Sequence, residues 1–393
     1  MLTFYFAPDL SAGSFRATAL VRALRAAAPP GTEIEVLTTQ PNRYSSYARE
    51  APTTESFEGC ELHRVALPAH QSDMRGQARA FVHFARGAHR WVGRRRYDLV
   101  FATSSRLMTA ALGAWMARRT GARLYLDVRD LFVDTITGLL PPALARMAYL
   151  ALAPLESWTM RRAARVNLVS PGFAPYFRAR YPQLSLAFFT NGIDEEFLAA
   201  SAAPAARLPA DRPTVLYAGN IGEGQALHEI VPGLALALRE RARLVVIGDG
   251  GRRSQLEQAL VRAGADNVQL LPPMSREQLI RAYQGSDVLL LHLGRQAAFE
   301  KVLPSKLFEY AALGKPLLAG VSGYAARFIR EEIDNAVVFA PGDVAAAVRG
   351  FGALTLADQA RPAFVAKYRR RQISAQLAED VLAVAAAPGR PAP

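Results

Sequence analysis

The sequence has a single cysteine, Cys60, and no long apolar run. One cysteine excludes a disulfide within the chain, so we expect a reduced, intracellular protein. No apolar stretch approaches the roughly 18 residues that a membrane-spanning helix needs. The first residues read as a strand and lack the charged and then apolar parts of a secretion leader. Neither a secreted nor an integral membrane protein is therefore expected.

Patterns for metal and nucleic-acid binding are also missing. The six histidines show no metal-ligand spacing, and no Asp-x-Asp pair is present to hold a Mg²⁺-bound diphosphate. The chain has no recognised nucleic-acid motif and no stacking series of aromatic residues with basic spacing. We therefore expect no metal site and no nucleic-acid partner.

A glycine run at Gly248, Gly250 and Gly251 follows an expected strand, as in dinucleotide-binding proteins. The run lacks the full G-x-G-x-x-G spacing and an acidic residue placed for a ribose. A dehydrogenase is therefore disfavoured.

Acidic residues are scarce beside basic ones. The chain has 34 Asp and Glu against 47 Lys and Arg, a formal net charge of +13. The excess lies in patches that all precede Asn191: Arg86, Arg90, Arg94, Arg95 and Arg96; Arg118 and Arg119; Arg161, Arg162 and Arg165. Such patches attract polyanions, and an anionic membrane surface is favoured over nucleic acid.

An apolar stripe at helical spacing precedes the last of these patches. Its members are Leu144, Met147, Ala148, Ala151, Leu155 and Trp158. One interpretation is a helix that faces the core, with Arg161 and Arg162 complementing its C-terminal dipole. The other is a helix whose apolar face contacts a membrane.

Hydrophobic residues make up 51% of the chain, enough for two cores. Strands alternate with helices, which favours an α/β fold with parallel sheets in two Rossmann-like halves. We expect strands in the first half at residues 2–6, 34–38, 99–102, 124–127, 166–169 and 186–189. In the second half we expect them at residues 215–218, 244–247, 268–270, 288–291, 317–319 and 337–339.

This pattern predicts an N-terminal domain over residues 1–198 and a C-terminal domain over residues 199–363. Residues 199–213, rich in Ala and Pro, read as the linker. A helix over residues 364–387 is expected to cross back to the first domain, and residues 388–393 to form a disordered tail.

The segment from Pro304 to Pro316 places a cation and a carboxylate one helical turn apart. With Pro304 and Ser305 opening a helix, free backbone N–H groups and Lys306 would face a phosphate. Glu309 could accept both hydroxyls of a ribose. The alternative is a surface helix with an ordinary i,i+3 ion pair.

Two glycine loops offer further anion sites. Gly13 and Ser14 precede a helix expected from Phe15, with Arg16 in its first turn. The second loop follows a strand and contains Gly219, Asn220 and Gly222, with His228 shortly after it.

Together these landmarks resemble glycosyltransferase family 4. The matching residues are Tyr5-Phe6-Ala7-Pro8-Asp9 with Gly13, Asn191-Gly192-Ile193-Asp194, Gly219-Asn220-Ile221-Gly222, Gly248-Asp249-Gly250 and the block from Pro304 to Pro316. They occur in the family's order across nearly the whole chain. The resemblance implies a GT-B fold, with two Rossmann-like domains facing across a cleft. It also implies a nucleotide-sugar donor held mainly by the C-terminal domain, retention of anomeric configuration, and no metal or cofactor.

Within the family the chain is similar to bacterial transferases that build O-antigen and other surface polysaccharides, especially those for N-acetylfucosamine-type amino sugars. Pro41-Asn42-Arg43-Tyr44 is part of this likeness. It implies a UDP-linked N-acetyl amino sugar as donor and a lipid-linked saccharide as acceptor. The protein would then be cytoplasmic and peripherally associated with the inner membrane face.

The family's pattern assigns roles to particular residues. Its first glutamate corresponds to Lys301, with Glu300 one residue early, and Arg129 or Asp130 stands where relatives have a histidine. The loop at Gly222 lacks the family's Arg and Lys, so Lys306 would carry more of the diphosphate charge. The expected catalytic residues are Arg129, Asp130, Glu300 and Lys306. The expected donor-binding residues are Gly13, Ser14, Arg16, Gly219, Asn220, Gly222, Gly248, Gly250, Arg252, Ser305, Lys306, Leu307 and Glu309.

Two alternatives stay open beside a retaining glycosyltransferase. Loss of the first glutamate and of the Arg/Lys pair is also compatible with a catalytically silent GT-B protein that binds a partner at the membrane. A nucleotide-sugar epimerase of the same fold is the lesser alternative.

Overall fold

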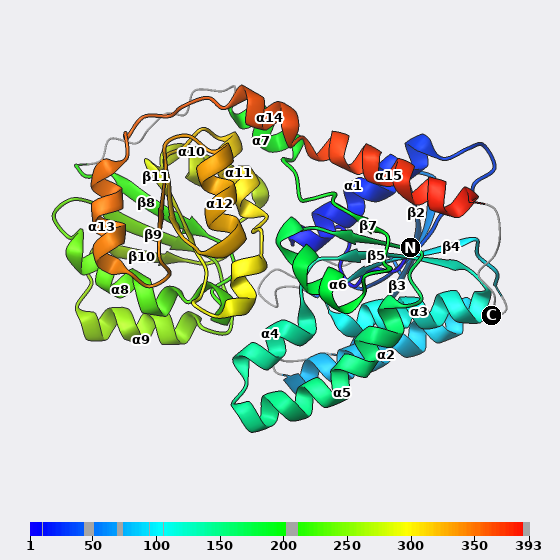
Figure 1. The fold of residues 1–393 in the computed structure, drawn as a ribbon. Coiled ribbons are helices and arrows are strands. Elements are labelled where there is room, and N and C mark those ends of the chain that lie inside the picture. Colours follow the sequence, from blue (N-terminus) through cyan, green and yellow to red (C-terminus); the bar gives the residue numbers. More distant parts are fainter. Residues whose placement is uncertain are drawn as a thin grey trace. The chain divides into compact units, whose positions relative to one another are not determined.

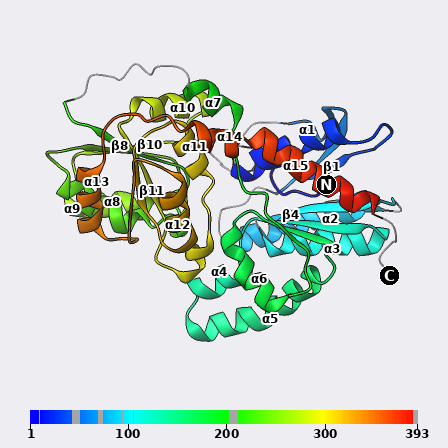
Figure 2. The same cartoon turned by 45° about the horizontal axis from the view of Figure 1, so that its top comes forward.

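The computed structural model describes residues 1–9, 11–42, 51–68, 74–93, 95–104, 106–201 and 211–387. The expectations for Arg43, Tyr44, Arg94, most of the linker and the tail at 388–393 lie outside the described residues. The chain forms two compact units, residues 1–191 with 371–393, and residues 192–370. Within each unit, helices cover both faces of a sheet (Figures 1 and 2).

The first unit is built on mainly parallel strands. One sheet has the order β4 (Leu99–Ser104), β5 (Arg123–Val128), β6 (Arg165–Leu168) and β7 (Leu186–Ala187). A second has the order β1 (Glu35–Thr39), β3 (Cys60–Val65) and β2 (Thr54–Phe57). Leu2 makes parallel bridges to Leu37 and Ala102, so it links the two sheets.

Two features of this unit differ from the sequence-based expectation. The first strand, expected at residues 2–6, is reduced to the bridges at Leu2. The strands β2 and β3 form an antiparallel hairpin that was not expected. Its turn, Glu58–Gly59, has φ values of 52° and 74°. Positive φ at both turn residues is typical of tight hairpins.

The helices of the first unit come from both ends of the chain. They are α1 (Ala12–Ala27), α2 (Met74–Val92), α3 (Leu107–Thr120), α4 (Phe132–Leu139), α5 (Pro142–Met160), η2 (Pro171–Phe173), α6 (Ala174–Arg180) and α15 (Arg370–Ala386). α15 packs on α1, β4 and β5 through Leu377, Ala378 and Val381. Asp380 accepts a hydrogen bond from the Tyr125 hydroxyl at 2.6 Å. The C-terminal helix is therefore part of the first unit's core.

The second unit contains a six-stranded parallel sheet in the order β10-β9-β8-β11-β12-β13. Its strands are β8 (Thr214–Ala218), β9 (Arg243–Ile247), β10 (Val268–Leu271), β11 (Val288–His292), β12 (Leu317–Gly320) and β13 (Ala336–Phe339). The strand order reverses between β8 and β11. In open α/β sheets, ligands bind at the carboxyl ends of strands where the order reverses.

The helices of the second unit are α7 (Glu195–Ser201), η3 (Glu223–Gln225), α8 (Leu227–Ala237), α9 (Arg253–Ala263), α10 (Arg276–Gly285), η4 (Ala297–Lys301), α11 (Lys306–Ala312), α12 (Gly323–Glu332), α13 (Val344–Ala353) and α14 (Pro362–Lys367). The interior between the sheet and α8, α9 and α13 is a cluster of Val, Leu, Ile and Phe side chains. Both units are thus Rossmann-like α/β units with parallel or mainly parallel sheets, as the alternating pattern predicted.

The border between the units lies at residues 191/192, several residues before the expected one at 198/199. The Ile193 N–H donates to the Tyr368 carbonyl at 2.8 Å, and the Arg370 N–H donates to the Ile193 carbonyl at 2.9 Å. These bonds tie the segment after Asn191 to the second unit. The helix expected over 364–387 is divided into α14 and α15.

Among the described residues, no helix is both long and apolar enough to cross a membrane.

Candidate functional site

Lys306 and Gly219 meet at the carboxyl end of β8. The Lys306 ammonium donates a hydrogen bond to the Tyr217 hydroxyl at 3.0 Å and lies 4.1 Å from the centre of that ring. A Cβ at Gly219 would lie 2.2 Å from the Lys306 Nζ, and Gly219 has a φ of 139°. Glycine at this position therefore permits both the backbone shape and the approach of the cation.

Lys306 is half-buried, and burial lowers the pKa of its ammonium to about 8, although nearby Glu309 opposes this shift. Much of its population is still protonated near neutral pH. A cation held in a partly desolvated place at the end of a parallel strand is suited to bind a phosphate group.

Glu309 lies one turn after Lys306 on α11. Its carboxylate is half-buried and has no hydrogen-bond partner among the residues that the structure describes. Burial raises its pKa, while the charges of Arg276, Arg370 and Lys306 oppose that shift. A carboxylate kept near these cations and left without a donor can accept hydrogen bonds from ligand hydroxyls.

Asp194 joins two arginines near Glu309. The Asp194 carboxylate binds the guanidinium groups of Arg276, the first residue of α10, and Arg370. The Arg276 guanidinium also lies over the Phe197 ring, 5.0 Å from its centre. Sequence reasoning used Asp194 only as part of a family motif and missed both arginines. The Ser275 capping box was the available signal, because it marks the start of α10 and so places Arg276 in the first turn of a helix.

The two glycine loops of the second unit lie against each other. The Gly219 N–H donates to the Ile247 carbonyl at 2.8 Å, and the Ile221 N–H donates to the Asp249 carbonyl at 2.9 Å. A Cβ at Gly248 would lie 1.9 Å from the Gly219 carbonyl oxygen.

Gly250 makes a similar approach to the other loop. A Cβ at Gly250 would lie 2.5 Å from the Ile221 carbonyl oxygen. The glycine run is therefore needed for backbone contact between the loops after β8 and β9.

Other predicted residues of these loops bind protein groups. The Asn220 side chain donates to the Gln225 side chain at 2.8 Å, close above Gly222. The Arg252 guanidinium binds the Glu223 carboxylate and donates to Gln255 at 2.7 Å. The expectation that Arg252 supplies an extra cation is thus weakened, because Glu223 neutralises it.

The start of α11 differs from the expected helix N-terminus. α11 has seven residues, and the Ser305 side chain makes no capping hydrogen bond. The N–H groups of Leu307 and Phe308 donate to the carbonyls of Pro304 and Ser305 at 3.2 and 3.1 Å. These two amides are therefore not free for a phosphate. Leu307 is fully buried, backbone included, so it is not exposed for the expected contact with the donor.

Glu300 lies on η4, outside the helix that carries Glu309. Its side chain is exposed, and its backbone packs on the start of α12, where a Cβ at Gly323 would lie 2.1 Å from the Glu300 carbonyl oxygen. Val302 ends this 3₁₀ turn in an extended conformation. Glu300 and Glu309 therefore do not lie on one regular helix. The offset of Glu300 by one residue from the position of the family's first glutamate does not amount to a rotation about a helix axis.

In the first unit, Gly13 and Arg129 come together. Ser11 caps α1 by accepting a hydrogen bond from the Ser14 N–H at 3.1 Å, so α1 begins at Ala12, three residues before the expected start. Gly13 and Ser14 therefore lie in the first turn. A Cβ at Gly13 would lie 2.3 Å from the Arg129 guanidinium. Asp130, the next residue, is exposed.

Arg16 has a structural role in place of the expected contact with the donor. Its guanidinium is buried and donates two hydrogen bonds to Asp127, at 2.9 and 2.8 Å. It also donates to the Thr190 and Phe189 carbonyls at 2.7 and 2.8 Å. The Asp127 carboxylate neutralises the guanidinium. Through these hydrogen bonds Arg16 connects α1 to β5 and to the segment before Asn191.

His292 is a buried residue whose role the sequence did not reveal. Its Nδ1 lies 2.7 Å from the Gln225 carbonyl, and its Nε2 accepts a hydrogen bond from the Gly342 N–H at 3.0 Å. These partners require a neutral ring, and burial lowers the pKa of His292 to about 4. It connects the loop after β8 to the loop after β13.

His228 lies on the first turn of α8, close after that loop. It is half-buried, and its Nε2 is 3.9 Å from the Glu229 carboxylate. Within the described part of the chain, no three His, Cys, Asp or Glu residues are grouped so that they could hold a metal ion.

Comparison with known families covers most of the chain. Residues 13–192 match the family described as a glycosyl transferase 4-like domain, and residues 202–372 match the glycosyl transferases group 1. A curated relative is WcaI of Escherichia coli (strain K12), named as a colanic acid biosynthesis glycosyl transferase. It is 29% identical over 214 residues, which are 51% of this chain and 51% of that protein. The match thus spans about half the length of this relative.

Solved structures resemble the chain over nearly its full length. The α,α-trehalose 6-phosphate synthase from Burkholderia multivorans has a TM-score of 0.71 at 15% identity, covering 100% of this chain and 98% of that one. HepE from Anabaena, solved with UDP-glucose, has a TM-score of 0.65 at 15% identity, covering 97% and 98%. At this identity the likeness shows the fold. The chain therefore belongs to the GT-B glycosyltransferases, with a glycosyl transferase 4-like domain followed by a group 1 domain.

Proposed function

We propose that this protein is a retaining glycosyltransferase that moves a sugar from a nucleotide-sugar donor to a lipid-linked saccharide in surface polysaccharide biosynthesis. One observation carries the proposal. Lys306 and Glu309 share a short helix whose first residue reaches Gly219, at the point where the strand order of the second unit reverses.

In this proposal each of the two residues binds one part of the donor. Lys306 binds the diphosphate and stabilises the negative charge that grows on it as the glycosidic bond breaks. Glu309 accepts hydrogen bonds from the ribose hydroxyls, and the charges of Arg276 and Arg370 favour its ionised form, against burial, which raises its pKa. The acceptor hydroxyl attacks from the face that the diphosphate leaves, so the anomeric configuration is retained.

Further residues are proposed to support the reaction. Gly219, Gly222, Gly248 and Gly250 offer backbone close to the diphosphate. Arg129 beside Gly13, with Asp130, is proposed to act near the donor sugar, as is Glu300.

We propose a UDP-linked N-acetyl amino sugar as donor. HepE, a structural neighbour, was solved with UDP-glucose. The amino sugar is suggested by the sequence likeness to O-antigen transferases, and WcaI is itself named for polysaccharide biosynthesis. Lys306 supplies the positive charge that a metal gives in other transferases, so we propose a reaction without metal or cofactor.

The charge of the first unit supports the proposed acceptor and place of action. Its exposed arginines would attract an anionic membrane surface, where a lipid-linked acceptor resides. We therefore propose a cytoplasmic protein that associates peripherally with the inner membrane face.

A catalytically silent binding protein is the second candidate. It is favoured by Lys301, which stands where the family has its first glutamate. A panel of UDP- and other nucleotide-linked sugars, incubated with a lipid-linked acceptor pool, separates the candidates. Transfer or slow donor hydrolysis supports the enzyme, isomerisation of the donor indicates an epimerase, and binding without turnover of any donor supports the silent protein.

A further inference from the structure

The first half of α5 exposes a cluster of large apolar side chains. Leu144 is 51% exposed, Met147 is 67% exposed and Leu150 is 64% exposed. Their spacing of three residues places them along one side of the helix. Tyr149 adds a further apolar ring that is 43% exposed. Single exposed apolar residues are ordinary, but a cluster on one helix indicates a contact surface.

The second half of α5 behaves differently. Thr159 and Met160 are buried, and Glu156 is a buried carboxyl that accepts hydrogen bonds from the Tyr176 and Tyr181 hydroxyls at 2.7 and 3.2 Å. The core-facing interpretation of the apolar stripe therefore fits only the second half of the helix. The second half anchors α5 in the unit, and the first half presents apolar side chains to its surroundings.

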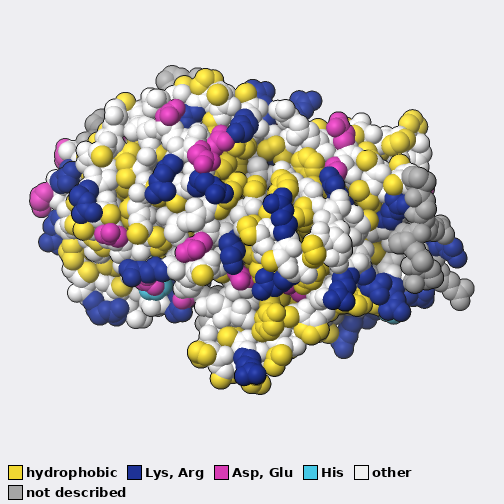
Figure 3. All heavy atoms as spheres, in the orientation of Figure 1, with side chains coloured by type: hydrophobic (Ala, Val, Ile, Leu, Met, Phe, Trp, Pro, Cys, Tyr) yellow, Lys and Arg dark blue, Asp and Glu magenta, His cyan; other side chains and the backbone are white. Residues whose placement is uncertain are grey.

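The helices α2, α3 and α5 are strongly basic. α2, α3 and α5 contain one carboxylate between them, the buried Glu156. The same helices and the turn after α5 carry exposed arginines: Arg79, Arg86, Arg90, Arg118, Arg119, Arg146, Arg161 and Arg162. In Figure 3 the surface over α5 shows hydrophobic and basic side chains. Apolar residues among arginines match the chemistry of an anionic lipid surface.

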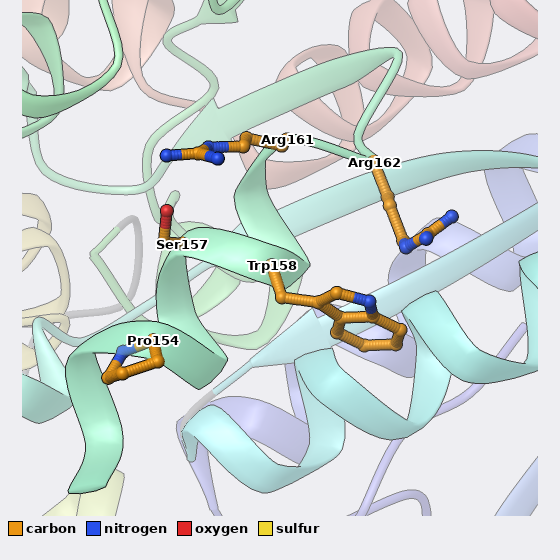
Figure 4. A pocket seen from close by; sticks show the side chains of 5 residues that line it. All are labelled: Pro154, Ser157, Trp158, Arg161 and Arg162. Atoms are coloured by element: carbon orange, nitrogen blue, oxygen red, sulfur yellow. The ribbon is translucent and has the colours of Figure 1, made fainter.

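A pocket of about 580 Å³ lies at the end of α5, lined by Pro154, Ser157, Trp158, Arg161 and Arg162. Figure 4 shows the Arg161 side chain extending above Ser157 and that of Arg162 reaching toward Trp158. The Arg162 guanidinium lies 4.9 Å from the centre of the Trp158 ring. Two guanidinium groups beside an aromatic ring can bind a phosphate headgroup while the ring stays at the membrane interface.

We propose that the first half of α5 inserts Leu144, Met147 and Leu150 into the interfacial layer of an anionic membrane, while the surrounding arginines bind lipid phosphates. This inference rests on the proposed function only in one respect, namely that an enzyme with a lipid-linked acceptor must act at a membrane. The attraction of arginines fades over a Debye length of about 8 Å at physiological salt. Salt does not screen the insertion of apolar side chains, so part of the binding should persist at high salt.

The first test is co-sedimentation of the full chain with vesicles of phosphatidylcholine and phosphatidylglycerol, without donor or acceptor. The variant Leu144→Gln, Met147→Gln, Leu150→Gln should lower the partition coefficient by roughly tenfold or more at high salt. The matched control is Leu236→Gln, Val261→Gln, since Leu236 and Val261 are 42% and 81% exposed on helices of the other unit. The control should bind like the wild type, and both variants should keep the wild-type melting temperature.

The second test locates the helix in the membrane. Met147→Cys can be labelled selectively with an environment-sensitive fluorophore, because Cys60 is buried. On vesicles its emission should shift to the blue and be quenched by nitroxide lipids, whereas a label at Val261→Cys should show neither effect. Wild-type binding by the triple variant, or an unshielded label at Met147, would overturn the proposal.

Two further outcomes separate this inference from its rivals. A dimer in solution that the triple variant abolishes, without a change in vesicle binding, would assign the cluster to a second copy and overturn the proposal. Vesicle binding by a protein that turns over no donor would reject the proposed enzyme and leave the membrane contact supported. Donor hydrolysis without vesicle binding would do the reverse.

Discussion

The Lys306 ammonium lies 3.0 Å from the Tyr217 hydroxyl and 4.1 Å from the centre of the same ring. Tyr217 belongs to β8 and Lys306 begins α11, so the contact joins two elements that meet at the carboxyl edge of the sheet. The tyrosine fixes the position of the cation, and Gly219 leaves room for it. In our account this arrangement replaces the cations that relatives carry on the loop after β8.

Replacing Lys306 should therefore affect the diphosphate more than the nucleoside. We expect Lys306→Ala to weaken nucleoside diphosphate binding by about 1.5–3 kcal/mol, the range for a charge-assisted hydrogen bond, with little change for the nucleoside alone. Calorimetric titration with UDP and with uridine measures both. Lys301→Ala serves as the control, and an equal loss in this variant would speak against a specific role of Lys306.

Glu309 should act on the ribose. Glu309→Ala is expected to weaken binding of UDP and of uridine alike, by about 1.5–3 kcal/mol, because the ribose hydroxyls lose a charged acceptor. The sharper test uses 2′-deoxy-UDP, whose affinity should depend less on Glu309 than that of UDP. If the variant lowers the affinity of both ligands equally, the carboxylate does not contact the 2′-hydroxyl.

The pKa of Lys306, about 8, predicts a pH dependence. A diphosphate binds the protonated amine better, and its own last proton is lost at about pH 6, so the diphosphate keeps its charge while the lysine titrates around pH 8. Affinity for UDP should fall about twofold between pH 7 and 8 and by up to about tenfold per pH unit above that. Lys306→Arg stays protonated there and should give a flat profile. A flat profile for the wild type would contradict the lowered pKa.

His292 predicts a loss of stability in acid. Its pKa is about 4 in the folded protein, against about 6.5 in an unfolded chain, so the unfolded chain binds the extra proton first. The free energy of unfolding should fall as the pH drops from about 6.5 to 4, by roughly 3 kcal/mol in total from this residue. Urea unfolding of wild type and His292→Asn at pH 7.5 and 4.5 measures it. The variant should be less stable at pH 7.5 and lose less on acidification.

Chelation tests the proposed independence from metal. With Lys306 in place of a metal ion, turnover should persist in excess EDTA. Loss of activity that Mg²⁺ or Mn²⁺ restores would show that a cation is needed after all.

The sequence predicted most of the strand pattern and the placement of Lys306 and Glu309 one helical turn apart, because both depend on local signals. Helical spacing links Lys306 to Glu309, and glycine after a strand marks a loop that another group approaches. The β2–β3 hairpin escaped prediction because its strands are short and mix apolar with polar and charged residues. β2 has four residues, none of them buried, and β3 includes Glu61, His63 and Arg64, so neither strand forms a continuous apolar run.

Contacts between distant residues were not predictable in this way. Asp194 binds Arg276 and Arg370, which are 82 and 176 residues away along the chain. Arg16 was assigned to a phosphate because it follows a glycine loop, but Asp127, 111 residues away, binds it instead. The spacing of residues along the sequence does not indicate such ion pairs. Only the folded structure shows which cations are bound by carboxylates of the protein and which can bind a ligand.

The most direct test of the account is the structure of the product. Wild-type protein, incubated in EDTA with the UDP-sugar panel and a lipid-linked acceptor, should add one N-acetylhexosamine-type unit to the acceptor. Mass spectrometry would show the added mass, and NMR should show the anomeric configuration of the donor. Lys306→Ala should reduce this product strongly. A product with inverted configuration would contradict the retaining mechanism, and no product from any donor would contradict the assignment as an enzyme.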